Sequence, residues 1–151
     1  MIEATLCHII ANNRILLQRK SQGRFGAGKW NGPGGKMEPG ESPLDSVRRE
    51  VLEETGLELV DPRFTGVLDF FFDQRERPDW RVYVFKATSY RGEPRGGGEG
   101  ELAWFPVEEI PYGEMWEDDA HWLPLVLEGR HFRGWFWFQG DKLLDHRLTT
   151  W

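Results

Sequence analysis

The stretch GKMEPGESPLDSVRREVLEETGL, residues 35–57, carries the clearest structural signals of the chain. Ser42 is suited to the N-cap of a helix, Pro43 to its first turn, and Gly56 to the position just beyond its last turn. Apolar residues recur at helical spacing and predict the buried face: Leu44, Val47 and Val51. These features predict a helix over residues 42–56.

Three glutamates of this helix, Glu50, Glu53 and Glu54, stand at positions i, i+3 and i+4 and project from one side. That side flanks the apolar face, so the carboxylates lie at the edge of the core, where a cleft can form. Like charges at this spacing destabilise a helix by roughly 0.2–0.5 kcal/mol per pair. A hard divalent cation would relieve the repulsion, and Mg²⁺ usually binds substrate phosphates as well. A solvated acidic helix face is the alternative interpretation.

The residues before the helix read GRFGAGKWNGPGGKMEPG over positions 23–40, which is too glycine-rich to predict regular structure. Glycine allows positive φ angles and a close approach of the backbone to a ligand. A glycine loop directly before an acidic helix therefore favours a ligand site over a solvated surface.

Residues 35–57 resemble the Nudix box at each of its defined positions, from Gly35 through Glu41 to the run REVLEETGL that begins at Arg49. The resemblance implies an α+β fold, an α/β/α sandwich with a mixed sheet and a catalytic loop–helix–loop. It implies hydrolysis of a pyrophosphate bond with Mg²⁺, or Mn²⁺, as cofactor. The implied metal ligands are the carbonyl of Gly35 and the carboxylates of Glu50, Glu53, Glu54 and, from a later loop, Glu99.

The same resemblance implies the catalytic roles. Arg49 would orient a carboxylate, and Glu41 would support the junction between loop and helix. Either Glu53 or Glu54 would double as the base that orients the attacking water. A solvated loop acid is the alternative for Glu99.

Two further stretches, at residues 23–36 and 112–140, resemble the oxidised purine nucleoside triphosphatases, which act on substrates such as 8-oxo-dGTP. The second stretch contains the unusual order MWEDD, which is more specific than the box alone. The resemblance implies substrate-binding residues: Asn31 on the purine, Phe25 and Trp116 as apolar surface, Asp118 and Asp119 on the base edge, and Lys20 on a phosphate. Their alternatives are loop bracing for Asn31, core packing for Trp116, helix capping for the aspartates and simple exposure for Lys20.

Adjacent carboxyl groups in an apolar pocket raise each other's pKa by repulsion and desolvation. We therefore expect Asp118 and Asp119 to be able to change protonation state and so accept differently oxidised purines. The sequence departs from the resemblance in two places. Pro33 replaces a bulkier apolar residue, and the loop DQRERPDW brings Trp80 towards the pocket wall. Both departures bear on which oxidised base is preferred.

The rest of the chain predicts strands and one more helix within a single domain, residues 1–151. The helix is expected at residues 119–127, with Asp119 as its cap. Loops are expected at residues 73–79 and 90–100. Strands are expected at residues 4–10 and 14–19 around an Asn12–Asn13 turn, at 64–72, 81–87 and 102–105, and in a hairpin around Gly140.

Composition limits the cellular context and the partners. The formal net charge of −6 argues against binding of nucleic acid polymers. The single cysteine, Cys7, is expected to be a buried thiol. Because no basic leader and no apolar run of about 20 residues is present, we expect a cytoplasmic protein without membrane contact. A monomer is expected, since one chain of this size can bury a small nucleotide.

Three functions are compatible with these observations. The first is sanitation of the nucleotide pool, in which an oxidised purine nucleoside triphosphate is cleaved to monophosphate and pyrophosphate. The second keeps the chemistry but uses ADP-ribose, a dinucleoside polyphosphate or a methylated purine nucleotide. The third, a non-catalytic nucleotide sensor, is disfavoured because the glutamates of the box are intact.

Overall fold

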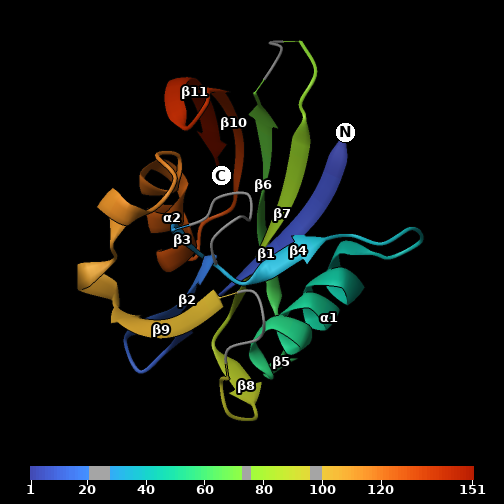
Figure 1. Ribbon diagram of the computed structural model, residues 1–151, viewed down its shortest axis with the longest axis vertical. Helices are drawn as coiled ribbons and strands as arrows, with labels where there is room; N and C mark the ends of the chain where they lie inside the picture. Colours follow the sequence, from blue (N-terminus) through green and yellow to red (C-terminus); the bar gives the residue numbers. More distant parts are fainter. Residues whose placement is uncertain (21–27, 73–75, 96–99) are drawn as a thin grey trace.

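The computed structural model describes residues 1–20, 28–72, 76–95 and 100–151, except the side chain of Lys20. Short 3₁₀ turns at Val107–Glu109 and Tyr112–Glu114 lead to the second helix. The strands and helices, drawn in Figure 1, are β1 (Ile2–Ala11), β2 (Arg14–Lys20), β3 (Trp30–Asn31), β4 (Gly34–Lys36), α1 (Pro43–Thr55), β5 (Glu58–Val60), β6 (Arg63–Phe71), β7 (Trp80–Ala87), β8 (Ser89–Arg91), β9 (Gly100–Pro106), α2 (Asp119–Leu127), β10 (Phe132–Gln139) and β11 (Lys142–Thr150).

The main sheet is mixed and runs in the order β11-β10-β6-β7-β1-β2-β3, with β4 paired to β1 and β9 paired to β2. The pairs β1–β7 and β6–β10 are parallel, and the others are antiparallel. Figure 1 shows α1 and α2 on opposite sides of this sheet. The predicted α+β sandwich with a mixed sheet is confirmed.

Two apolar cores form because successive residues of a strand face opposite sides of the sheet. On β1, Leu6 joins the cluster beneath α2, whereas Cys7 and Ile9 join the cluster beneath α1. The Cys7 thiol is fully buried, as predicted. Each helix is therefore fixed to its own face of the sheet.

Helix α1 begins and ends where the sequence predicts. The hydroxyl oxygen of Ser42 accepts a hydrogen bond from the Asp45 backbone N–H at 3.1 Å. Gly56 ends the helix with a φ of +78°. One detail of the prediction is wrong, because Leu44 is 41% exposed while Val47 and Val51 are fully buried.

The exposure of Leu44 follows from its place in the first turn of α1, because at about 100° per residue it lies on the same side as Val51 and Thr55, which are fully buried. Ser46 and Glu54 are buried together with the two valines. With about 100° per residue, the buried arc is thus turned towards the glutamate side of the helix. Leu44 lies on the side of the valines but at the N-terminal end of the helix, whereas Glu54 is buried against the sheet.

The glycine-rich segment 23–40 contains two short strands that the sequence did not predict, β3 and β4. Gly34 explains why glycine is required there, since a Cβ at this position would lie 2.1 Å from the backbone oxygen of Thr5. The expected loop at residues 90–100 is also partly wrong, because β8 reaches Arg91 and pairs with β5. In both cases the pairing partner is distant in sequence, so local patterns do not reveal it.

Strand β5 was not predicted either, whereas the other strands and α2 agree with the prediction to within a few residues at each end. Asn12 and Asn13 have φ angles of 53° and 61°, as a tight hairpin turn requires. The hairpin around Gly140 is formed by β10 and β11. Helix α2 has the expected range, but Asp118 rather than Asp119 occupies its N-cap position. No helix in the described part of the chain is long and apolar enough to cross a bilayer.

Candidate active site

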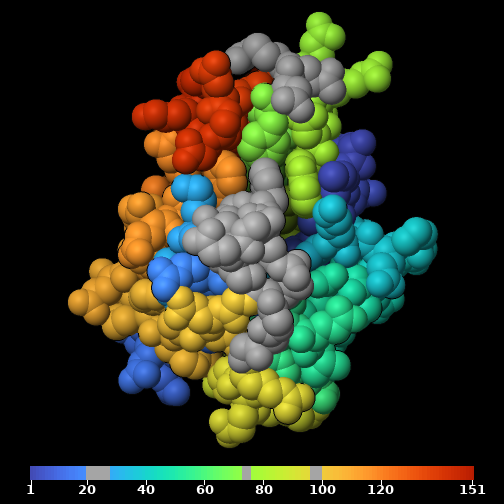
Figure 2. Space-filling model, in the orientation of Figure 1, coloured from blue at the N-terminus to red at the C-terminus, as the bar shows by residue number. Residues whose placement is uncertain are grey.

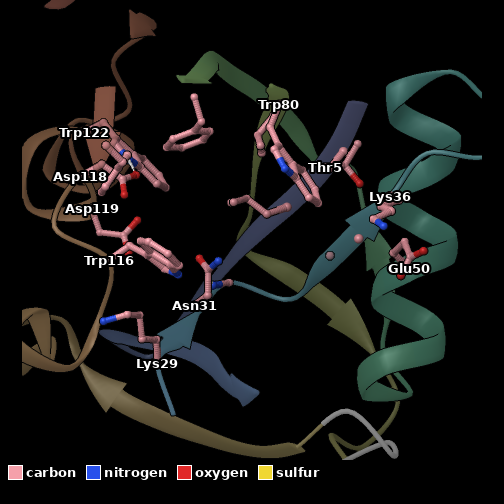
Figure 3. A pocket seen from close by; sticks show the side chains of 18 of the residues that line it. Thr5, Lys29, Asn31, Lys36, Glu50, Trp80, Trp116, Asp118, Asp119 and Trp122 are labelled. Carbon is pink, nitrogen blue, oxygen red and sulfur yellow. Dashed lines mark hydrogen bonds between the residues drawn. The ribbon is translucent and has the colours of Figure 1, made fainter. Parts of the chain in front are cut away.

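A cavity of about 670 Å³ lies between the N-terminal end of α2 and the side of α1 that carries Glu50 and Glu54. Figure 2 shows the molecule from the same side as Figure 1, with α1 to the right and the region around α2 to the left. Figure 3 shows side chains of the lining, with Glu50 at one end and the pair Asp118 and Asp119 at the other. The cavity therefore joins the two groups of residues that the sequence singled out.

The end of the cavity at α1 is lined by the carboxylates of Glu50 and Glu54 and by the backbone of Gly35. A Cβ at Gly35 would lie 2.4 Å from Oε2 of Glu50, so only glycine permits this approach. Glu54 is buried, and its Oε2 accepts a hydrogen bond from Nε2 of Gln18 at 2.5 Å. Glu50 is thus held directly against the glycine strand β4, and Glu54 is held against β2.

Arg49 ties the loop before α1 to the helix. Its guanidinium donates two hydrogen bonds to Glu41, from Nε at 2.6 Å and from Nη2 at 2.9 Å. It also donates to Glu50 at 2.9 Å, to Glu53 at 3.2 Å and to the carbonyl of Lys36 at 3.2 Å. The hydrogen bond from Arg49 is the main reason that the pKa of Glu41 falls to about 2. Glu41 is therefore an ionised brace between loop and helix.

Glu53 differs from its two neighbours, because its side chain is 59% exposed and is not part of the cavity lining. The bond from Arg49 holds it on the outer side of the helix. Three other predicted site residues lie outside what the structure describes: Phe25, Glu99 and the side chain of Lys20.

The groups at this end are suited to a hard divalent cation. Glu50, Glu54 and the backbone of Gly35 offer oxygen donors only, which is the preference of Mg²⁺. Among the described residues no three His, Cys, Asp or Glu side chains gather into a complete metal site. A full coordination shell would thus need further oxygens, from the backbone, a phosphate or a residue such as Glu99.

The opposite end of the cavity is aromatic. Trp116 makes edge contacts with Phe72 and Phe138, at ring distances of 6.2 Å and 5.5 Å. Nζ of Lys29 lies 5.3 Å from the Trp116 ring centroid. Asn31 lines the same end, and its side-chain oxygen accepts a hydrogen bond from the backbone of Gly32 at 2.9 Å. Asn31 thus braces the loop with its oxygen and retains its amide donors for a ligand.

Asp118 and Asp119 line the cavity although both are buried. Oδ2 of Asp118 accepts a hydrogen bond from Nε1 of Trp122 at 2.7 Å. Burial raises the pKa of Asp118 to about 6. Burial, and then repulsion from Asp118, raises the pKa of Asp119 well above its usual value. The expected pKa rise is confirmed, with desolvation as its main cause.

Helix capping does not account for these aspartates. The Asp118 side chain makes no capping hydrogen bond, and Asp119 is already the first residue of α2. Oδ2 of Asp119 is buried and finds no hydrogen-bond partner among the described residues. A buried oxygen without a partner is costly, and its place in a cavity wall points to a ligand as the missing partner.

The sequence interpretation did not single out several residues of the lining. Lys29, Phe72, Trp122 and Phe138 belong to the aromatic end, and Trp80 does form part of the wall as expected from its loop. The alternation of burial along β10, FRGWFWFQ, was the available signal for Phe138, because every second residue faces the cavity side. Gln18, a lone amide in the apolar strand RILLQRK, was the signal for the contact to Glu54.

The model of the NUDIX domain matches residues 1–126 of the chain. The oxidized purine nucleoside triphosphate hydrolase of Danio rerio is 42% identical over 146 residues, which cover 95% of this chain and 92% of that protein. The protein of the same name from Mus musculus is 39% identical over the same shares. The crystal structure of the MutT protein from Bacillus halodurans superposes with a TM-score of 0.88 at 33% identity, over 98% of this chain and 97% of that one.

Proposed function

Since the chain belongs to the Nudix hydrolases and is therefore a pyrophosphohydrolase, we propose that its substrate is an oxidised purine nucleoside triphosphate. Hydrolysis would give the nucleoside monophosphate and pyrophosphate, and would remove oxidised nucleotides from the pool. The names of the two vertebrate relatives support this substrate class. The observation that carries the proposal is the single cavity that joins an acidic end to a buried aspartate pair.

The dimensions and composition of the cavity suit a nucleotide. A volume of about 670 Å³ lies within the usual range for small-molecule sites, roughly 300–1,000 Å³. Aromatic side chains at one end can stack a flat base, and the carboxylates at the other can meet phosphates only through a cation. This distribution favours a ligand with an uncharged ring and an anionic tail.

At the acidic end, Glu50, Glu54, the carbonyl of Gly35 and Glu99 are the proposed ligands of Mg²⁺, or of Mn²⁺. The bound cation would screen the phosphate oxygens and stabilise the charge that develops on them. Glu53 remains a candidate ligand from the sequence, although its exposed position favours Glu54. Arg49 and Glu41 fix the orientation of Glu50 from behind.

Hydrolysis of the triphosphate adds water across one P–O bond between the α- and β-phosphates. The water oxygen bonds to phosphorus, the bridging oxygen leaves with its electron pair, and the water proton passes to a carboxylate. Of the two candidates for that base, Glu54 faces the cavity. The amide of Gln18 holds the other oxygen, Oε2, of this carboxylate in place.

At the base end, recognition would combine stacking with hydrogen bonds. A protonated carboxyl of Asp119 donates, an ionised Asp118 accepts, and the amide of Asn31 donates. Trp116 and Phe72 provide the apolar surface. Exchange of the proton within the aspartate pair would let the pocket accept purines whose oxidation exchanges donors and acceptors; a pH-independent preference among oxidised purines would contradict it.

The proposal is tested by product analysis with Mg²⁺ and a panel of 8-oxo-dGTP, 2-hydroxy-dATP, dGTP, ADP-ribose and diadenosine tetraphosphate. Faster turnover of the oxidised purines than of dGTP, with monophosphate and pyrophosphate as products, would support it. Glu53→Gln and Glu54→Gln serve as controls for the acidic end. Cleavage of only ADP-ribose or the dinucleotide would keep the chemistry and remove the role of Asp118 and Asp119.

Two alternatives remain open to the same experiment. Another diphosphate substrate would be revealed by its products, and a nucleotide sensor would bind without turnover in Mg²⁺. We also expect a monomer, because the cavity within one chain, about 670 Å³, is large enough to bury a small nucleotide.

A further inference from the structure

We propose that Gln18 is a positioning residue of the acidic end, which fixes the Glu54 carboxylate for a divalent cation and contributes little to folding. The inference rests on the proposed role of Glu54 as a metal ligand. It concerns a residue on the opposite side of the site from Arg49, outside residues 35–57.

The contact is short and fully enclosed. Nε2 of Gln18 donates to Oε2 of Glu54 at 2.5 Å, and the Gln18 side chain is 1% exposed. Gln18 lies on β2 two residues beyond Leu16, which is buried beneath α1. Because i and i+2 share a face of a strand, Gln18 points at the same layer as α1. The amide therefore meets Glu54 at the interface of sheet and helix.

The chemistry of the pair sets the orientation of the amide. An ionised carboxylate only accepts hydrogen bonds, so the NH₂ group of Gln18 must face Glu54 and its oxygen must point elsewhere. That oxygen, Oε1, is buried and has no hydrogen-bond donor among the described residues. The fold satisfies half of the amide and leaves the other half unpaired.

An unpaired buried oxygen makes the amide unfavourable for folding, and an apolar side chain of the same length would avoid that cost. The cluster of side chains beneath α1 is apolar, and Leu102, which lies opposite Gln18 on β9, packs against it. The amide is thus explained by the carboxylate that it orients. Groups that orient metal ligands typically alter metal affinity or activity by 10- to 100-fold when they are replaced.

The test is a titration of the nucleotide-free protein with Mn²⁺, followed by electron paramagnetic resonance, together with thermal unfolding. Gln18→Met keeps the length and volume of the side chain and removes the donor. Gln18→Asn keeps an amide that is one methylene too short to reach Glu54. Gln139→Met, at the exposed end of β10, is the matched control.

We expect both Gln18 variants to bind Mn²⁺ at least tenfold more weakly, with Gln139→Met unchanged. The melting temperature of Gln18→Met should be equal to or higher than that of the wild type. With nucleotide, kcat should fall while KM stays the same, because the base end is intact. A purely structural amide would instead lower the melting temperature.

Equal Mn²⁺ affinity in the wild type and in both Gln18 variants would overturn the inference. So would a loss of affinity that is accompanied by a lower melting temperature in Gln18→Met. A wild type that cleaves a different diphosphate would remove the proposed substrate, yet the Mn²⁺ titration would still decide the role of Gln18. A wild type that binds no Mn²⁺ would overturn the proposed metal site and the inference together.

Discussion

The two ends of the cavity contain carboxyl groups in opposite environments. At α1, Glu41 is held by Arg49, which lowers its pKa to about 2. At α2, Asp118 is buried and accepts a hydrogen bond from Trp122, and burial raises its pKa to about 6. The carboxyl group is therefore kept ionised at one end, whereas at the other end its pKa is raised towards neutral pH and it can take up a proton more readily. One end suits cations, and the other suits the donors and acceptors of a base.

The largest expected effect separates two adjacent glutamates of the acidic end. Glu54→Gln should reduce kcat by on the order of 10³-fold, because a cation site worth several kcal/mol loses a cavity-facing carboxylate. Glu53→Gln should reduce it far less, since the Glu53 side chain is 59% exposed and outside the cavity lining. Steady-state kinetics with Mg²⁺ measures both.

An equal loss in the two variants would show that the outer carboxylate turns inward when a cation binds. In that case the exposure of a glutamate side chain in this structure would not predict whether it binds the cation. The difference between the ionic end and the base end would then be less sharply defined. Melting temperatures within a few degrees of the wild type are the control for folding.

The next effect concerns the base end. Asp119→Asn replaces a carboxyl group, which can gain or lose a proton, with an amide, which cannot. Part of the hydrogen-bonding edge of the base then meets no complementary group. A buried mismatch costs about 1–3 kcal/mol, so kcat/KM for 8-oxo-dGTP should fall on the order of 10²-fold. The Mn²⁺ affinity of the nucleotide-free protein should not change, because the acidic end is intact.

Asp119→Asn should also alter the preference between 8-oxo-dGTP and 2-hydroxy-dATP, which differ in their donors and acceptors. A uniform loss for both nucleotides would indicate that Asp119 only shapes the pocket. A loss of Mn²⁺ affinity would show that the two ends are not independent.

The two ends also differ in how far the sequence could predict them. The acidic end is local: Ser42, Glu50, Glu54 and Gly56 all belong to one loop and helix, and their spacing specifies caps and a charged face. The exposure of Leu44 could not be predicted, because it depends on which turns of the helix the sheet covers.

The base end is assembled from distant elements, including β3, β6, α2 and β10. Asn31, Trp116 and the aspartates were found through resemblance to a family, whereas Phe72 and Phe138 needed the register of the sheet. The pairing of β10 with β6 brings Phe136 beside Phe70 and thereby sets the aromatic end. Such contacts span more than sixty residues and leave no local signal beyond the alternation of each strand.

A smaller effect should be seen in the pH dependence of stability. The folded-state pKa of Asp118 is raised from 3.8 to about 6, so its contribution to stability is fully present below pH 3.8 and is lost as pH rises through 6. Replacing both aspartates, in Asp118→Asn/Asp119→Asn, removes this loss. The variant should therefore gain on the order of 2 kcal/mol relative to the wild type between pH 4 and pH 7.

Urea unfolding gives the free energy of unfolding of both proteins at pH 4 and at pH 7. The value of the wild type is subtracted from that of the variant at each pH. His8 acts in the opposite direction, because burial lowers its pKa to about 3 and favours folding as pH rises. Its effect is common to both proteins and cancels. A constant difference between pH 4 and pH 7 would show that the aspartates do not titrate in this range.

The smallest expected effect tests whether the base end binds its ligand without contacting the charged phosphates. Lys29 contacts the Trp116 ring at 5.3 Å and Oδ2 of Asp141 at 3.8 Å, with 28% of its side chain exposed. An exposed cation–π contact contributes about 0.5–1 kcal/mol and an exposed ion pair about as little. Lys29→Met should thus raise KM roughly threefold and leave kcat unchanged. If Lys29 acts only through Trp116, binding of 8-oxo-dGMP weakens as much as that of the triphosphate. A larger loss for the triphosphate would place a phosphate contact at Lys29, and the division of the cavity into an ionic end and a neutral end would no longer hold.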